Sequence, residues 1–157
     1  MGRRAADDVE FAEFVTAHEQ RLRQAFTSIW GPERGRDVAV DALAYGWEHW
    51  DRVRSMDNPV GYLFVVGRER ANRRRRREQS ILDFVVPSPT PPPWYEPALP
   101  ALIEELSDRE RQAVVLLHAF EWSLGEIAEL LEISKSSVQT YADRAMTKLR
   151  SGLGVQA

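Results

Sequence analysis

Apolar side chains recur every three or four residues through the first half of the chain, which is the spacing of a helix with one buried face. The first run covers residues 11–29 and stops before a Gly-Pro pair, so we expect a long helix that ends there. The same spacing predicts a second helix over about residues 33–52. Asn58-Pro59 is a helix cap followed by proline at the first helical position, and it predicts a third helix that runs into an arginine-rich segment.

Helix signals return in the last third of the chain. Ser107 and Ser123 each stand three residues before a glutamate, which is the pattern of a capping box. Ser134 predicts the start of a last helix, whose apolar face holds Val138, Ala142, Ala145 and Leu149. A short helix, a tight turn and a second helix with one polar face are typical of a helix-turn-helix.

Prolines divide these two groups of helices. Seven of the nine prolines lie between residues 87 and 100, and proline interrupts helices and strands alike. No segment has the alternating pattern of a strand. We therefore expect an all-α protein of two small helical domains, residues 8–82 and 101–152, joined by a proline-rich linker at residues 83–100. A peptide ligand for a proline-recognising domain is the alternative interpretation of that segment.

Composition excludes several classes of function. The chain of 157 residues has no cysteine and three histidines, so we expect no disulfide scaffold, no thiol catalyst, no metal site and no cofactor. No glycine-rich phosphate loop is present, and we expect the protein not to be an enzyme. No apolar stretch is long enough to cross a bilayer, which predicts a soluble, cytoplasmic protein without membrane insertion.

The charge is distributed very unevenly. The net charge is -3, yet residues 68–77 hold seven arginines against the single acid Glu69. Arginine suits phosphate because its planar fork can donate two parallel hydrogen bonds, whereas the alternative is a solvated helix end that complements the helix dipole. The DNA-binding candidates in this segment are Arg68, Arg70, Asn72, Arg73, Arg74, Arg75, Arg76 and Arg77.

The polar face of the last helix provides a second set of DNA-binding candidates. Its first two turns carry the candidate base readers Lys135, Ser136, Ser137, Gln139 and Thr140, and Arg144 and Lys148 are candidate phosphate contacts. The alternative is a compact three-helix domain with a solvated face, which Asp143 on the same face favours. Residues 101–157 hold nine acids against six bases, so we expect weak DNA affinity for this domain alone.

The order and spacing of three segments resemble the two-domain sigma factors of the extracytoplasmic-function type, in the sigma-70 family. The segments are DVAVDALAYGWEHWDRV, NPVGYLFVVGRERANRRRRRE and LSDRERQAVVLLHAFEWSLGEIAELLEISKSSVQTYADRAMTKLR, and the resemblance covers about residues 10–152. It implies a first domain that binds core RNA polymerase and opens the minus-ten promoter element, and a second that reads the minus-thirty-five element. An anti-sigma factor is a further candidate partner. The implied polymerase-binding residues are Asp37, Asp41 and Trp47, and Glu48 extends the same acidic face.

The chain departs from the family pattern at several positions. Glu69 replaces an asparagine that helps to capture an unstacked base, Arg73 replaces an acid, and Val40 replaces a polar residue. Glu132 replaces the usual turn glycine, at a cost of about 1 kcal/mol if the turn needs a positive φ.

The expected function is therefore that of a sigma factor, which directs core polymerase to specific promoters and assists transcription initiation. One alternative is a helix-turn-helix regulator of the LuxR type, which leaves the N-terminal half unexplained. Another is a degenerate sigma-like interaction protein that binds polymerase or a regulator and reads no promoter. Glu69 and the acidic C-terminal domain favour the latter.

Overall fold

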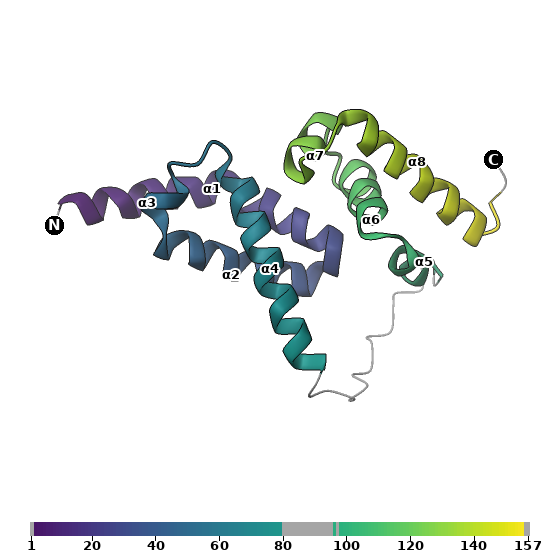
Figure 1. Cartoon of the computed structure of the whole chain (residues 1–157), viewed down its shortest axis with the longest axis horizontal. Helices are drawn as coiled ribbons and strands as arrows, with labels where there is room; N and C mark the ends of the chain where they lie inside the picture. Colours follow the sequence, from purple (N-terminus) through teal and green to yellow (C-terminus); the bar gives the residue numbers. More distant parts are fainter. Residues whose placement is uncertain (1, 80–95, 97, 156–157) are drawn as a thin grey trace. The chain divides into compact units, whose positions relative to one another are not determined.

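The computed structural model describes residues 2–79, 96 and 98–155, and every regular element in those ranges is a helix (Figure 1). The chain forms two compact units, one built on α1, α2, α3 and α4 as far as Arg73, and the other built mainly on α5 to α8. The all-α expectation is confirmed. The boundaries 8–82 and 101–152 stay predictions, and most of the expected linker, residues 83–100, lies outside the described residues. None of the described helices has the length and hydrophobicity needed to cross a membrane.

Helices α1 (Gly2–Trp30) and α2 (Pro32–Glu48) lie side by side and are joined at Gly31 (Figure 1). Gly31 has a φ of 86°, which glycine adopts without steric cost, and Pro32 opens α2 at its first position. The predicted end of the first helix is confirmed, whereas α1 starts well before its apolar repeat. The predicted second helix is divided at His49, and residues Trp50–Val53 form a separate short helix, α3.

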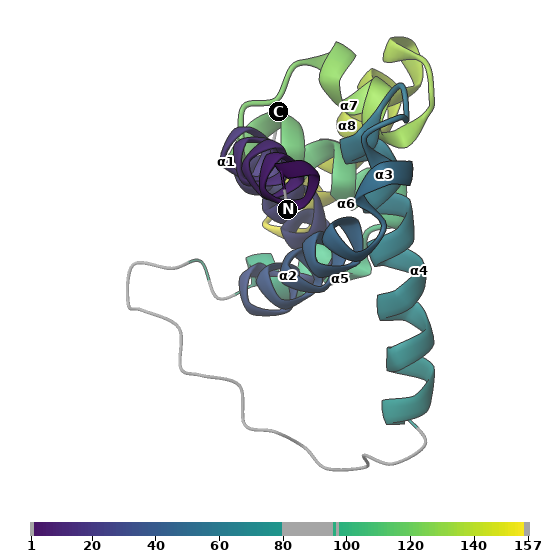
Figure 2. The same cartoon turned by 90° about the vertical axis from the view of Figure 1, so that its left-hand side faces the viewer.

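Helix α4 (Pro59–Gln79) packs against both α1 and α2. Its start is capped as expected, because the Gly61 N–H donates to the Asn58 side-chain oxygen at 3.0 Å. The rings of Phe26 and Phe64 stack in the core with centroids 5.3 Å apart. The C-terminal end of α4, which carries the arginine-rich segment, extends beyond α1 and α2 (Figure 2).

The second unit consists of α5 (Leu99–Glu105), α6 (Asp108–Val114), the π-helical turn η1 (Val115–Ala119), α7 (Leu124–Leu131) and α8 (Lys135–Gly152). Helix α5 was not predicted. Its side chains Leu102 and Ile103 pack against a buried cluster formed by Leu106, Val114, Ala145 and Leu149. The apolar face expected for the last helix is therefore confirmed as the buried face of α8.

The three serine caps predicted in this unit are present. Ser107 and Glu110 form the complete capping box, in which each side chain bonds to the backbone N–H of the other residue. The Ser123 hydroxyl accepts from the Glu126 N–H at 3.1 Å, and the Ser134 hydroxyl starts α8 in the same way. The caps at Ser123 and Ser134 thus fix the starts of α7 and α8, the two helices of the helix-turn-helix.

Glu132 connects α7 to α8 in the left-handed conformation, with φ 55° and ψ 44°. The backbone N–H groups of Glu132 and Ile133 both donate to the Ala128 carbonyl, so the turn needs this conformation to end α7. The condition attached to the replacement of the turn glycine by Glu132 is therefore met, because the residue has a positive φ.

Replacing Glu132 with glycine should stabilise the protein. Glycine removes the steric cost of the left-handed conformation, although it also loses more entropy on folding, so we expect a gain of about 0.5–1 kcal/mol in the free energy of unfolding. Urea unfolding followed by circular dichroism measures it. The matched control is Glu129→Gly in the same helix, which should cost about 1 kcal/mol. Equal destabilisation by both changes would contradict a cost at Glu132.

Candidate nucleic-acid interface

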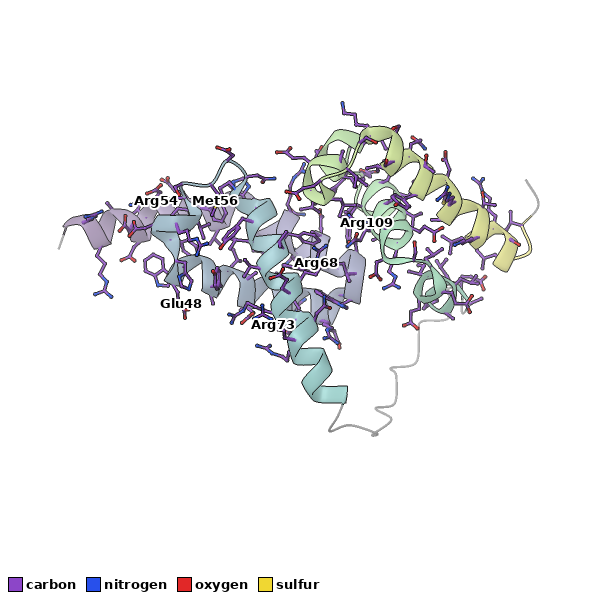
Figure 3. All side chains as sticks on the ribbon, viewed as in Figure 1. Glu48, Arg54, Met56, Arg68, Arg73 and Arg109 are labelled. Carbon is purple, nitrogen blue, oxygen red and sulfur yellow. The ribbon has the colours of Figure 1, made fainter. Side chains whose placement is uncertain are left out.

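The arginine-rich segment lies on the second half of α4. The Arg68 guanidinium is half-buried and lies over the Phe64 ring, 5.5 Å from its centroid, so this arginine is tied to the core. Asn72, Arg73 and Arg74 are exposed further along the same helix. Figure 3 labels Arg68 and Arg73 on α4. Residues 75–77 continue the helix, and their side chains lie outside the described part of the chain.

Glu69 has a basic neighbour one turn away. Its carboxylate lies 4.0 Å from the Arg73 guanidinium, and both side chains are well exposed. An exposed pair of this kind contributes little to stability. Its electrostatic effect is local: the two departures from the family pattern, Glu69 and Arg73, offset each other's charge on this face of α4.

Arg70 is engaged with a residue predicted for the other interface. Its guanidinium donates to both carboxylate oxygens of Asp41 on α2, at 2.9 and 3.4 Å, and lies over the Tyr45 ring. The hydrogen bond to Asp41 raises the pKa of Arg70. A predicted DNA contact and a predicted polymerase contact therefore hold α2 and α4 together.

The predicted polymerase face of α2 is otherwise open to solvent. Asp37 and Glu48 are exposed, and Val40 keeps 63% of its surface exposed. Trp47 is 39% exposed, with its ring 5.2 Å from that of Phe11. Glu48 lies at the end of α2, as Figure 3 shows. This face thus combines acids with exposed apolar surface.

An open cleft adjoins this end of α2. Its volume is about 580 Å³, and it is lined by Arg4, Asp7 and residues 47–52. Arg54 lies near this cleft, and no local sequence pattern indicated its importance. Its guanidinium donates to Asp7 at 2.8 Å and to Glu10 at 3.1 Å. The hydrogen bond to Asp7 raises the pKa of Arg54. The start of α1 is thereby tied to the segment that follows α3.

Helix α8 presents the predicted base readers on one face. Lys135, Ser136, Gln139 and Thr140 are exposed, and Ser137 is half-buried. The serine hydroxyls bond to that of Ser134, at 3.0 Å from Ser136 and 2.9 Å from Ser137. The Thr140 hydroxyl donates to the Ser136 carbonyl. The hydroxyl groups of this set are thus engaged within the helix start, whereas the Gln139 amide projects outward and bonds to the Asp143 carboxylate at 2.8 Å.

The two predicted phosphate contacts of α8 differ in their surroundings. Arg144 is exposed. Lys148 donates to Glu110 on α6 at 2.8 Å, and Glu110 is 3% exposed. The hydrogen bond from Lys148 lowers the pKa of Glu110 against the opposing effect of burial, with help from Ser107. Lys148 therefore compensates a buried carboxylate, and any phosphate contact would be additional to this role.

The predicted DNA-binding residues come from α4 and α8, and the predicted polymerase-binding residues come from α2. Their assignment to these partners stays a prediction. Within the ranges that the structure describes, no group of three or more acidic or histidine side chains is placed to hold a metal ion.

Replacing Lys148 with methionine should destabilise the protein in a pH-dependent way. The change keeps the aliphatic stem but removes the partner of the buried Glu110 carboxylate, so we expect a loss of about 1–3 kcal/mol at neutral pH. Because the folded-state pKa of Glu110 is lowered, the pair stabilises the fold above the carboxyl's ordinary pKa. That contribution disappears as pH falls through the lowered value.

Urea unfolding of wild type and variant between pH 7 and 3 measures this difference, which should shrink toward acid. Arg150→Met removes an exposed charge at the end of the same helix and serves as the matched control. A Lys148→Met effect that is the same at every pH would contradict the role of the Glu110 carboxylate.

Residues 97–149, which contain α5 to α7 and most of α8, match the family model of sigma-70, region 4. The chain is 28% identical over 153 residues to the RNA polymerase sigma-E factor of Streptomyces coelicolor, covering 92% of this chain and 86% of that protein. Its identity to the Streptomyces avermitilis sigma-E factor is 27% over the same shares.

The fold is shared with the sigma factor RpoE of Bartonella quintana, solved in complex with the anti-sigma factor NepR. The TM-score is 0.65 at 20% identity, over 94% of this chain and 99% of that one. The similarity to sigma-E factors extends through both units, which a LuxR-type regulator does not explain. Residues 97–149 thus match sigma-70 region 4, and the chain over most of its length is similar to RNA polymerase sigma-E factors.

Proposed function

We propose that this protein directs core RNA polymerase to specific promoters and assists transcription initiation, as a dissociable subunit that itself catalyses no bond formation. The observation that carries the proposal is the combination, in one chain, of a helix-turn-helix that matches sigma-70 region 4 and a helical unit that aligns with sigma-E factors. A protein that acts on RNA polymerase works in the cytoplasm, which is therefore part of the proposal.

In this proposal the first unit binds core polymerase through α2. Asp37 and Glu48 offer exposed carboxylates to a basic partner. The half-exposed Trp47 ring, which lines the cleft, offers apolar surface on the same helix. In an interface of this composition, an aromatic side chain that becomes buried and is surrounded by polar contacts contributes much of the binding free energy. Asp41 supports the face indirectly, because its pair with Arg70 holds α2 against α4.

The DNA contacts divide between phosphate and base. The exposed arginines of α4, beginning at Arg73, contact phosphates without regard to sequence. Helix α8 contacts the upstream element, with Gln139 reading a base edge and Arg144 holding a phosphate. Because the second unit is acidic overall, its contacts act within the complex with polymerase, where the first unit contributes the larger share of the affinity.

An anti-sigma factor is included as a further partner. The sigma factor RpoE of Bartonella quintana, which has a similar fold, was solved in complex with an anti-sigma factor. On this chain Val40 and Trp47 leave apolar surface exposed on α2, so a protein that covers this face would also block polymerase.

The second candidate is the degenerate interaction protein, which binds polymerase but reads no promoter. The observation in its favour is Glu69, an exposed carboxylate on the proposed DNA face of α4. The nearby Arg73 offsets this charge, which is why we favour the promoter-directing function.

Reversing one exposed charge should separate polymerase binding from folding. Asp37→Lys replaces an exposed carboxylate on α2 and should abolish co-purification with core polymerase while leaving the helical circular dichroism unchanged. Asp8→Lys makes the same change at an exposed position on α1 and should leave co-purification intact. Asp41 is unsuitable because its reversal also breaks the pair with Arg70. Undiminished binding of the Asp37→Lys variant would contradict the α2 interface.

Replacing four arginines of α4 with alanine should weaken promoter binding to the same extent for every promoter sequence. Alanine at residues 74–77 should lower the affinity of the polymerase complex for every promoter and flatten its salt dependence by roughly 0.7–0.9 log unit for each phosphate that is no longer bound. Exposed arginines of α1 provide the control, as Arg3→Ala/Arg4→Ala should leave the slope unchanged. An altered promoter preference at an unchanged salt slope would show that these arginines do not act on phosphates.

A further inference from the structure

Gln139 and Asp143 lie one turn apart on the exposed face of α8. The Gln139 side-chain nitrogen donates to one Asp143 carboxylate oxygen at 2.8 Å. Between them the helix is fixed on its other side, because Val138 and Ala142 are fully buried in the second unit. The pair therefore projects from a rigid surface at the part of α8 that the proposed function places against DNA.

An aspartate can hold a glutamine amide in only one orientation. An ionised carboxylate accepts hydrogen bonds and cannot donate them, whereas the two ends of an amide have opposite character. The nitrogen of Gln139 must therefore face Asp143, and the carbonyl oxygen must point away from it. Without the carboxylate, a half-turn about the last side-chain bond would exchange the two ends at little cost, and the amide would offer either a donor or an acceptor to a base.

The orientation that Asp143 imposes suits one base. The Gln139 carbonyl oxygen is left to accept, and the nitrogen keeps a second N–H to donate. Adenine offers the complementary pair in the major groove, an amino donor at N6 and an acceptor at N7. The neighbouring hydroxyl of Thr140 donates its proton to the Ser136 carbonyl, so that proton is not offered to the N7 acceptor of this base.

We propose that Asp143 is a positioning residue that holds the Gln139 amide so that α8 reads adenine at one position of the upstream promoter element. The inference rests on the proposed function and assigns a role to a carboxylate that otherwise only repels DNA. The charge of Asp143 lowers the affinity for every DNA sequence. Its hydrogen bond determines which base Gln139 recognises. Arg144, the next residue, supplies the opposite charge beside it.

The experiment uses the complete complex of the full chain with core polymerase, on a promoter library randomised in the upstream element. With the wild-type chain, initiation should favour adenine at one position by roughly fivefold or more. Gln139→Ala should reduce this preference to less than about twofold, and Asp143→Ala should do the same while raising initiation from all other sequences. The double variant should show no further decrease in preference, since the two residues act as one unit.

Two conservative variants separate positioning from charge. Asp143→Glu keeps an acceptor-only carboxylate one turn from Gln139 and should retain the adenine preference. Asp143→Asn removes the charge and replaces the carboxylate with an amide that can face Gln139 with either end, so the preference should fall as it does in Asp143→Ala. Glu105→Ala removes an exposed charge on α5 and should change neither the preference nor the overall level.

The outcomes distinguish this inference from the function on which it rests. If Gln139→Ala relaxes one position while Asp143→Ala and Asp143→Asn only raise initiation from all sequences alike, Asp143 acts through charge alone and the inference is overturned. If Gln139→Ala leaves every preference of a selective complex unchanged, Gln139 reads no base, which overturns the inference and leaves the promoter function standing. If the wild-type complex initiates at no promoter, the proposed function fails and the inference with it.

Discussion

The close approach of α4 to α1 and α2 at Gly67 determines where the first unit presents its charges. A Cβ atom at this position would collide with the Phe26 ring and lie 3.1 Å from the Cβ of Ala42, so no larger residue fits without moving α4. One turn earlier, Phe64 stacks on Phe26, and Arg68 one turn after Phe64 lies over its ring. The direction in which the arginine-rich end of α4 leaves the core thus follows from one small residue and one aromatic stack.

Charged groups in this protein serve structure and proposed function together. Asp41 with Arg70, and Glu110 with Lys148, join helices that are distant in sequence. Asp41, Arg70 and Lys148, which the sequence predicted to contact polymerase or DNA, are thus engaged in ion pairs within the protein. Asp37 on α2 and Arg144 on α8 are exposed, and the proposed function assigns recognition to charges of this kind. A net acidic chain can thus carry one strongly basic segment, because seven of its 21 basic residues lie within residues 68–77 of α4.

Local patterns in the sequence predicted the features that local physics controls. The cap at Asn58 and the capping box at Ser107 depend on residues three positions apart, and the positive φ at Glu132 follows from the geometry of a tight turn. The break at His49 and the short helix α5 were missed, because each is stabilised by packing rather than by its own pattern. The pairing of Asp41 with Arg70 spans 29 positions and leaves no signal in either segment.

The central claim is that this chain gives core RNA polymerase the ability to choose a promoter. Run-off transcription with purified core polymerase, with and without the wild-type chain, on a library of randomised promoters measures it directly. Our account predicts transcripts from a small set of related promoters that share an upstream and a downstream element, only when the chain is present. Stable association of the chain with core polymerase without selective initiation from any promoter would contradict it, and would favour the degenerate interaction protein.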